Sequence, residues 1–250
     1  TGAALLAAGA GARIAKHGNR SFTSRCGSAD VLEALGVAIE LTPEAMAEVL
    51  ERAGIVFMYA PLLHPAMRHV APVRRELGIP TVMNLLGPLT NPAGTRRQLV
   101  GVSDPRQLEL VARALLELGH EHALVVHGAP GLDELSPVGE TEVIEVRAGS
   151  LARYRLDPER RFGWHGLRAE ELAGGEPAEN ARTLEDVLAG RRAGAARAAV
   201  VLNAGATLYL AGLAPSLDDG VVQAELALAA GAGADALDRL RQASRAAAGA

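Results

Sequence analysis

Side chains suited to binding a phosphate group are concentrated early in the chain. Two stretches carry them, Lys16-His17-Gly18-Asn19-Arg20-Ser21-Phe22-Thr23-Ser24 and Gly27-Ser28-Ala29-Asp30. Lys16 can supply charge, hydroxyls can supply hydrogen bonds, and the N-terminus of a following helix can add backbone N–H groups. The same residues also suit a solvated strand-to-helix loop, because serine and threonine favour caps and turns. On these residues alone, both interpretations remain open.

Two adjacent acids form a second candidate site. Asp133 and Glu134 lie in a segment rich in glycine and proline, residues 128–137. Paired carboxylates can hold Mg²⁺, which usually keeps several waters and bridges to substrate phosphates. Exposed acids are more often simply solvated. Taken by themselves, these two residues favour the solvated interpretation.

Further residues could recognise a planar organic acid. The guanidinium of Arg74 offers two parallel hydrogen bonds to a carboxylate. His17 and His64 could line a binding site, although an isolated histidine is more often a structural residue. The pair Gly87-Pro88 would let the backbone approach a ligand closely, or it could simply form a turn.

The elements that must position these residues alternate between strands and helices up to about residue 145. This alternation predicts an α/β fold with a largely parallel central sheet flanked by helices. We expect strands over residues 12–15, 55–59, 99–102 and 123–127, and helices over residues 3–8, 29–35, 43–53, 64–77 and 105–118. Ser28 is the expected N-cap of the second helix. The strand at 123–127 would deliver the acidic segment to the ligand-binding edge of the sheet.

The second half of the chain departs from this alternation. Residues 141–147 and 151–156 are expected to form an antiparallel pair of strands around a turn. A helical tail is expected from about residue 178, with helices over 178–188, 195–213, 217–230 and 234–247. No boundary of a second domain is evident, so residues 1–250 are interpreted as one domain.

Composition excludes several classes of protein. The chain has 250 residues, of which 49% are hydrophobic and 22% charged, enough for one sizeable core. A net charge of −4 and only 3% aromatic residues argue against nucleic-acid binding. No apolar run approaches the length of a membrane span, and no signal peptide is expected. A single cysteine, Cys26, agrees with a reducing compartment, so a cytoplasmic protein is expected.

Six sequence motifs occur in a fixed order along the chain: KHGNR, GSADVLEALG, LHPAM, NLLGPLTNP, LDELSP and NAxAxLYxAG. Together they closely resemble the anthranilate phosphoribosyltransferase family over essentially the whole chain. The resemblance implies an α/β domain beside a small helical domain, with the active site in the cleft between them. It also implies transfer of the 5-phosphoribosyl group from PRPP to anthranilate in tryptophan biosynthesis.

The resemblance assigns roles to the candidate residues and makes Mg²⁺ the expected cofactor. Asp133 and Glu134 match its metal-binding motif. The PRPP-binding residues it implies are Thr1, Lys16, His17, Gly18, Asn19, Arg20, Ser21, Phe22, Thr23, Ser24 and Ser28. Those implied for anthranilate are Asn19, Arg74, His17, His64, Gly87 and Pro88. No side chain is expected to act as a nucleophile or general base, because positioning and electrostatic stabilisation suffice for this displacement.

The resemblance also shows what this chain lacks. The family has a helical N-terminal region and a glycine-rich GTGGD loop around the pyrophosphate, of which only Thr1 of a later Ser-Thr turn remains. We therefore expect a truncated chain, folded but nearly inactive, whereas the full-length family member is expected to be a homodimer. Two alternatives are an enzyme like the pyrimidine nucleoside phosphorylases and a noncatalytic nucleic-acid-binding relative. The motif at residues 203–212 is expected only to pack the helical tail.

Overall fold

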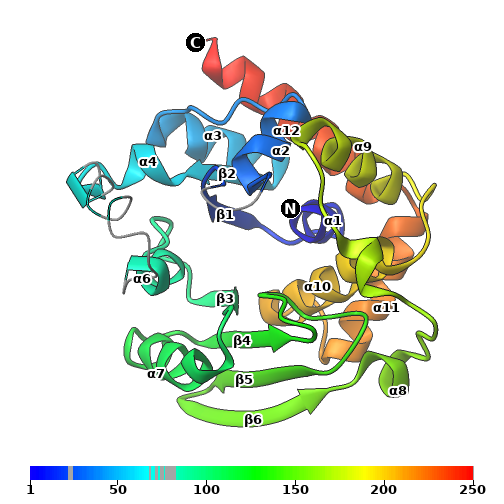
Figure 1. The fold of residues 1–250 in the computed structure, drawn as a ribbon. Helices are drawn as coiled ribbons and strands as arrows, with labels where there is room; N and C mark the ends of the chain where they lie inside the picture. The colour runs from blue at the N-terminus through cyan, green and yellow to red at the C-terminus, as the bar shows by residue number, and fades with distance from the viewer. Residues whose placement is uncertain (22–24, 68, 71–72, 74–75, 77–82, 250) are drawn as a thin grey trace.

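The computed structural model describes residues 1–21, 25–67, 69–70, 73, 76 and 83–249 (Figure 1). The first elements in order are α1 (Gly2–Gly9), β1 (Ile14–Gly18), α2 (Ser28–Ala34), α3 (Pro43–Ala53), β2 (Ile55–Tyr59), α4 (Ala60–Leu63), α6 (Met83–Leu89), β3 (Arg97–Gly101), η1 (Pro105–Gln107), α7 (Leu108–Glu117) and β4 (His122–Gly128). They are followed by β5 (Thr141–Arg147), β6 (Ser150–Leu156), α8 (Pro158–Phe162), η2 (Ala169–Leu172), α9 (Pro177–Leu188), α10 (Ala195–Ala211), α11 (Leu217–Ala229) and α12 (Ala232–Ala248). The expected α/β class is confirmed.

Local sequence signals account for the best-predicted helix, α3. The side chain of Thr42 accepts a hydrogen bond from the backbone N–H of Ala45, and Pro43 occupies the first turn. The helix ends at Gly54, whose φ of 74° lies in the left-handed region. The chain then enters β2 directly, so α3 and its cap set where that strand begins.

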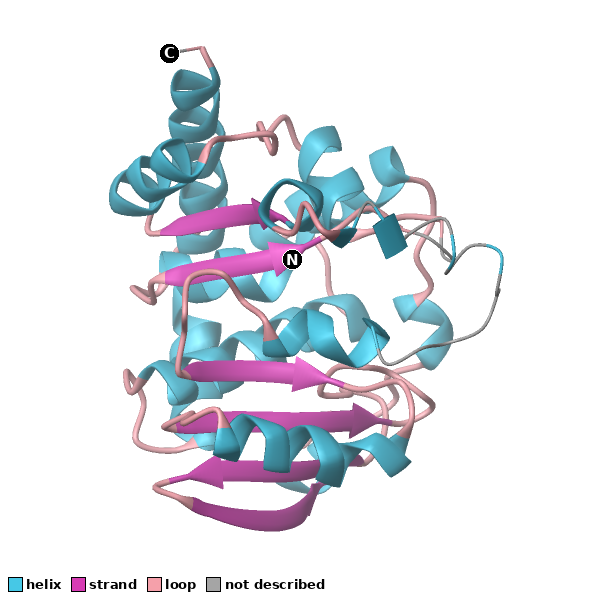
Figure 2. Cartoon of the chain, turned by 90° about the vertical axis from the view of Figure 1, so that its left-hand side faces the viewer, coloured by secondary structure: helices cyan, strands magenta, loops and turns pink. Residues whose placement is uncertain are grey.

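The described strands form two hydrogen-bonded ladders. β1 pairs with β2 in parallel, with Lys16 opposite Phe57 and Gly18 opposite Tyr59. The second ladder has the order β3-β4-β5-β6, in which β3 and β4 are parallel and the other two pairings antiparallel. Figure 2 shows the arrows of β1 to β4 pointing the same way. Their carboxyl ends therefore reach one edge of the molecule, where α/β proteins bind ligands.

The C-terminal helices are part of the main core. α10 and α12 both pack against α1, and α12 also packs against α3. One cluster of buried side chains accordingly extends from Leu5 to Ala243. A second, smaller cluster lies between α7 and one face of the four-stranded ladder. The segment predicted as a helical tail thus completes the layer that supports β1 and β2.

Several local expectations need correction. The described strands make two ladders where one central sheet was expected, and β4 pairs with β5 in antiparallel orientation in addition to the predicted β5–β6 pair. The N-cap of α2 is Gly27, and Ser28 is the first helical residue. Gly87 and Pro88 lie in the last turn of α6 and do not form a turn between elements. Pro88 has no backbone N–H to donate, and the helix ends at the next residue, Leu89. Within the helix predicted over residues 64–77, residues 68, 71–72, 74–75 and 77 lie outside the described residues.

The antiparallel pair was predicted correctly, and β6 begins one residue earlier than expected. Among the described helices, none combines the length and apolar character that crossing a membrane requires.

Candidate functional site

A cation, an acid and the start of a helix lie within electrostatic reach of one another. Lys16 is the central residue of β1 and is half-buried. Burial lowers the pKa of its ammonium group, and the carboxylate of Glu134 partly opposes that shift. Thr1, which precedes α1, lies within electrostatic reach of both Lys16 and Glu134. Residues separated by more than 100 positions therefore contribute to one charged site.

The end of β1 packs tightly against its neighbours because residue 18 has no side chain. A Cβ atom on Gly18 would lie 2.8 Å from Cε2 of Phe57 and would overlap the hydroxyl of Ser28. This close approach brings the start of α2 against the strand end. The hydroxyl of Ser28 donates to the carbonyl oxygen of Asn19 at 3.4 Å, so it helps to hold the turn that follows β1.

Two histidines lie on the other side of the β1 end. Nε2 of His17 and Nε2 of His64 are 3.1 Å apart, and the ring centroids are separated by 5.0 Å. Burial is the main cause that lowers the pKa of His17, and His64 adds to it, while a hydrogen bond to the backbone of Gly87 opposes it. The lowered pKa favours the neutral form of His17, whose ring contacts that of His64. The structure thus brings together three residues that the sequence assigned to one ligand.

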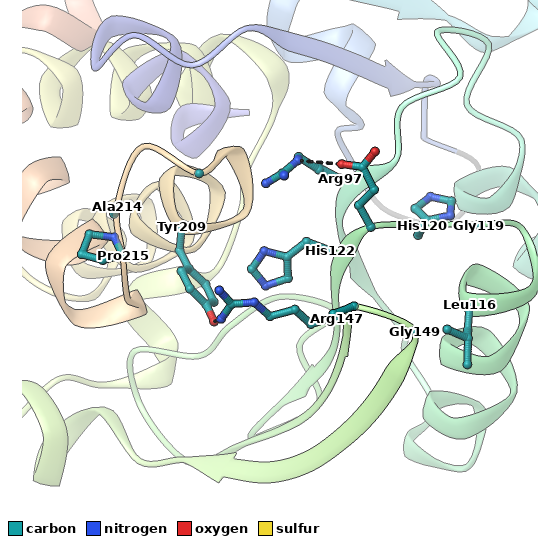
Figure 3. A pocket seen from close by; sticks show the side chains of 13 residues that line it. Arg97, Leu116, Gly119, His120, His122, Arg147, Gly149, Tyr209, Ala214 and Pro215 are labelled. Carbon is teal, nitrogen blue, oxygen red and sulfur yellow. Dashed lines mark hydrogen bonds and ion pairs between the residues drawn. The ribbon is translucent and has the colours of Figure 1, made fainter.

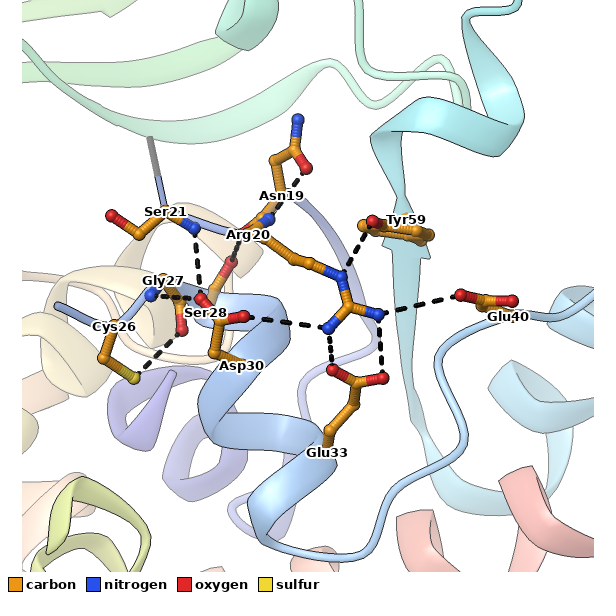
Figure 4. Close-up of polar contacts among 10 residues, drawn as sticks. All are labelled: Asn19, Arg20, Ser21, Cys26, Gly27, Ser28, Asp30, Glu33, Glu40 and Tyr59. Carbon is orange, nitrogen blue, oxygen red and sulfur yellow. Dashed lines mark hydrogen bonds and ion pairs between the residues drawn. The ribbon is translucent and has the colours of Figure 1, made fainter. Parts of the chain in front are cut away.

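Arg20 occupies a different position from the one expected of a phosphate ligand. Figure 4 shows its guanidinium turned toward Glu33, with Nη2 2.9 Å from Oε1 and a second bond from Nη1 to Oε2. Its Nε donates to the hydroxyl of Tyr59 at 3.0 Å, and the guanidinium lies over that ring. Glu40 lies 3.7 Å from the same group. The geometry therefore supports a structural role, in which Arg20 ties the turn after β1 to α2 and β2.

Asp30 closes the base of the same turn. Its Oδ2 accepts hydrogen bonds from the backbone N–H groups of Gly27 at 2.8 Å and Ser21 at 3.1 Å (Figure 4). Burial alone would raise the pKa of this carboxyl, but the two N–H donors and Arg20 outweigh it, so the pKa is lowered. One ionised carboxylate thus holds both ends of the turn. The bond to Gly27 also explains why the helix is capped there.

The acidic segment is a well-connected loop between β4 and β5. Gly128 and Leu132 exchange backbone hydrogen bonds, of which Gly128 N–H to Leu132 O measures 2.8 Å. The buried Ser136 donates its N–H to the hydroxyl of Thr141 at 2.9 Å. Asp133 and Glu134 remain exposed at the tip of this framework. A loop whose backbone is held by hydrogen bonds and whose two carboxylates face solvent suits a cation such as Mg²⁺, which keeps part of its hydration shell.

Those two acids fit Mg²⁺ bound together with a substrate better than Mg²⁺ held by protein alone. Within the described ranges, no three histidine, cysteine, aspartate or glutamate side chains cluster as metal ligands. Mg²⁺ needs about six oxygen ligands, and it commonly takes them from one or two carboxylates, substrate phosphates and water. The donor set at Asp133 and Glu134 is of this kind.

A separate hollow of about 660 Å³ lies at the opposite edge of the four-stranded ladder (Figure 3). Its cations are already engaged within the protein. Arg97 donates to the carbonyl of Leu210 at 2.9 Å and lies 3.4 Å from Glu121. Arg147 donates to the hydroxyl of Tyr209 at 2.8 Å. This hollow is lined by none of the residues that the sequence assigned to PRPP, anthranilate or Mg²⁺.

Four of the predicted site residues, Phe22, Thr23, Ser24 and Arg74, lie outside the described residues. Two others already have partners within the protein. Asn19 uses its side-chain oxygen to accept the N–H of Arg20 at 2.7 Å. Pro88 offers its carbonyl to Gln98 Nε2 at 2.6 Å.

Sequence reasoning noted Asp30 and Asn203 within motifs but did not predict the contacts through which they hold the turn after β1 and the acidic loop. Asp30 stands three residues after the Gly27 cap, which is a recognisable capping position. Asn203 contacts the acidic loop from 68 residues away, and no local pattern reports such a contact.

Comparisons with known proteins define the class first. Residues 1–234 match the family described as "Glycosyl transferase family, a/b domain". An anthranilate phosphoribosyltransferase from Rubrobacter xylanophilus is 56% identical over 249 residues, covering 100% of this chain and 72% of that protein. One from Methylobacterium radiotolerans is 51% identical, covering 97% and 70%.

Solved structures agree with these relatives. The crystal structure of the Thermus thermophilus anthranilate phosphoribosyltransferase has a TM-score of 0.91 at 49% identity, covering 98% of this chain and 72% of that one. The Saccharomyces cerevisiae enzyme in complex with PRPP and Mg has a TM-score of 0.88 at 28% identity, covering 98% and 69%. The chain therefore belongs to this glycosyl transferase family and, within it, to the anthranilate phosphoribosyltransferases.

Proposed function

We propose that this protein transfers the 5-phosphoribosyl group of PRPP to the amine of anthranilate, giving N-(5-phosphoribosyl)anthranilate and pyrophosphate for tryptophan biosynthesis. The observation that carries the proposal is that Lys16 of β1, Glu134 of the loop after β4 and Thr1 before α1 lie within electrostatic reach of one another. A partly buried cation beside an acid that can hold Mg²⁺ suits a substrate bearing both phosphate and pyrophosphate.

The protein contributes binding and orientation on the PRPP side. Lys16 would donate to a phosphate oxygen, with Thr1, Asn19 and the turn that Asp30 closes forming the rest of that wall. When bound, Mg²⁺ would neutralise charge on the leaving pyrophosphate. Asp133 and Glu134 would hold it. The phosphate roles of Phe22, Thr23 and Ser24 stay proposals from the family resemblance.

The anthranilate side is proposed to include His17, His64 and the Gly87-Pro88 segment, with Arg74 recognising the carboxylate. The contact between the two imidazoles supports this, because it offers polar edges, and the lowered pKa of His17 favours a form of that side chain that adds no charge near an aromatic amine. Anthranilate's amine is already neutral near neutral pH, so attack needs no strong base. We also propose a cytoplasmic homodimer for the complete protein.

Ligand-dependent melting tests this function. PRPP with Mg²⁺ is expected to raise the melting temperature of the complete gene product by on the order of 5 °C at saturating concentration, because a ligand of the folded state stabilises it. PRPP with a chelator is expected to give a smaller shift. A shift with duplex DNA and none with PRPP would contradict the proposal and favour a nucleic-acid-binding relative.

A further inference from the structure

The acidic loop between β4 and β5 is hydrogen-bonded to one buried side-chain amide on α10. Asn203 is 2% exposed and accepts the backbone N–H of Leu135 through Oδ1 at 3.0 Å. Its Nδ2 donates to the carbonyl of Leu135 at 2.9 Å and to that of Ala199 at 2.9 Å. Both backbone polar groups of the residue that follows Glu134 are therefore paired with a single side chain.

The loop also rests on the end of β3. A Cβ atom on Gly101 would overlap the carbonyl group of Asp133, so the loop backbone packs directly on this glycine. The loop is thus contacted both by β3, through Gly101, and by α10, through Asn203. The two supports act on residues 133 and 135 and fix Glu134 between them.

The two hydrogen bonds from Asn203 to the backbone of Leu135, here called the clasp, require a side-chain amide. An asparagine offers a neutral donor and acceptor on one rigid group, whereas aspartate would lack the donor and leucine both. Without the clasp, the N–H and C=O of buried Leu135 would lose their partners, and unpaired buried groups favour a rearranged backbone. A displacement there would move Glu134, the next residue.

We propose that Asn203 is a positioning residue for the Asp133-Glu134 pair, with Gly101 as its counterpart on β3. This inference rests on the proposed function, because it takes the pair as the Mg²⁺ site. It gives the motif at residues 203–212 a role in orienting the metal-binding carboxylates. Groups that orient metal ligands are typically worth about 10- to 100-fold in metal affinity or activity.

The test uses Asn203→Leu in the complete gene product, with Gly101→Ala as a second variant that acts from β3. Each is expected to raise the Mg²⁺ concentration for half-maximal transfer about tenfold, while the KM for anthranilate stays unchanged. A readout without turnover is amide hydrogen exchange at Leu135, expected to accelerate at least about tenfold in Asn203→Leu. The Mg²⁺ dependence of the PRPP-induced melting shift should move in the same direction.

The matched control is Asn180→Leu. Asn180 makes the same two-bond clasp on Gly175, at 2.9 and 3.0 Å, away from the acidic loop. The Asn180→Leu variant should leave the Mg²⁺ response unchanged. A folded Asn203→Leu or Gly101→Ala protein with a wild-type Mg²⁺ response would overturn the proposal, as would an equal shift in Asn180→Leu. Wild-type protein that binds PRPP with Mg²⁺ but transfers nothing would count against the proposed function alone.

Discussion

Replacing Asp133 by asparagine and Glu134 by glutamine in one protein is expected to abolish the Mg²⁺ dependence of transfer and to lower the rate at least about 100-fold. The shapes of the side chains are kept, but the charges that attract Mg²⁺ with its pyrophosphate ligand are lost. Stabilising the leaving group is the main electrostatic task of such a displacement, and loss of such stabilisation commonly costs about 10²–10³ in rate. Steady-state rates over a Mg²⁺ titration measure the effect.

Stability should be nearly untouched in that double variant. Both acids are exposed, and surface substitutions without a structural partner usually change stability by less than about 0.5 kcal/mol. Glu140→Gln is a suitable control, because Glu140 is an exposed acid in the same connection and pairs with Arg155 at 3.4 Å. A double variant that still responds to Mg²⁺ like the wild type would remove the metal assignment.

Lys16→Met is expected to raise the KM for PRPP roughly 10- to 100-fold without lowering the melting temperature. A hydrogen bond to a charged group contributes about 1.5–3 kcal/mol, which corresponds to that range. The pKa of Lys16 is lower in the folded protein than in the unfolded chain, so folding disfavours its protonated form. The ammonium group therefore subtracts from stability at neutral pH, and an apolar side chain of similar length should relieve that cost.

The control for Lys16 is Arg13→Met, which removes another cation just before β1. Arg13 pairs with Glu51 on the surface, and both side chains are at least 60% exposed. We expect neither melting temperature nor KM to change appreciably, since exposed ion pairs contribute about 0–1 kcal/mol. Lys16→Met protein with a lower melting temperature and a normal KM would show that Lys16 serves the fold.

Elements with complete local signals were the ones that sequence predicted well. β2 has the predicted bounds, because an apolar run begins directly after the Gly54 cap. The order Thr42, Pro43 and Gly54 likewise determined α3. Where the signals conflicted, prediction failed: Gly87 and Pro88 indicate a turn, yet both belong to the last turn of α6. Tertiary contacts there, including Gln98 to the Pro88 carbonyl, override local preference.

The positions of several candidate residues were predictable, but the contacts that support them were not. Lys16 and His17 lie at and just after the centre of the short strand β1, Glu134 follows β4, and parallel strands bring such positions toward one edge. The contacts of Arg20 were not predicted, because its partners, Glu33 and Tyr59, come from two other elements. The contact of Asn203 with the acidic loop could not be predicted for the same reason, because the sequence around a buried asparagine does not indicate which distant backbone groups it bonds.

The most direct measurement of the central claim is a fluorescence assay of anthranilate consumption by the complete gene product with PRPP and Mg²⁺. The account predicts that fluorescence falls only when both are present, and that one pyrophosphate appears for each anthranilate consumed. Phosphate-dependent cleavage of a pyrimidine nucleoside with no consumption of anthranilate would contradict it.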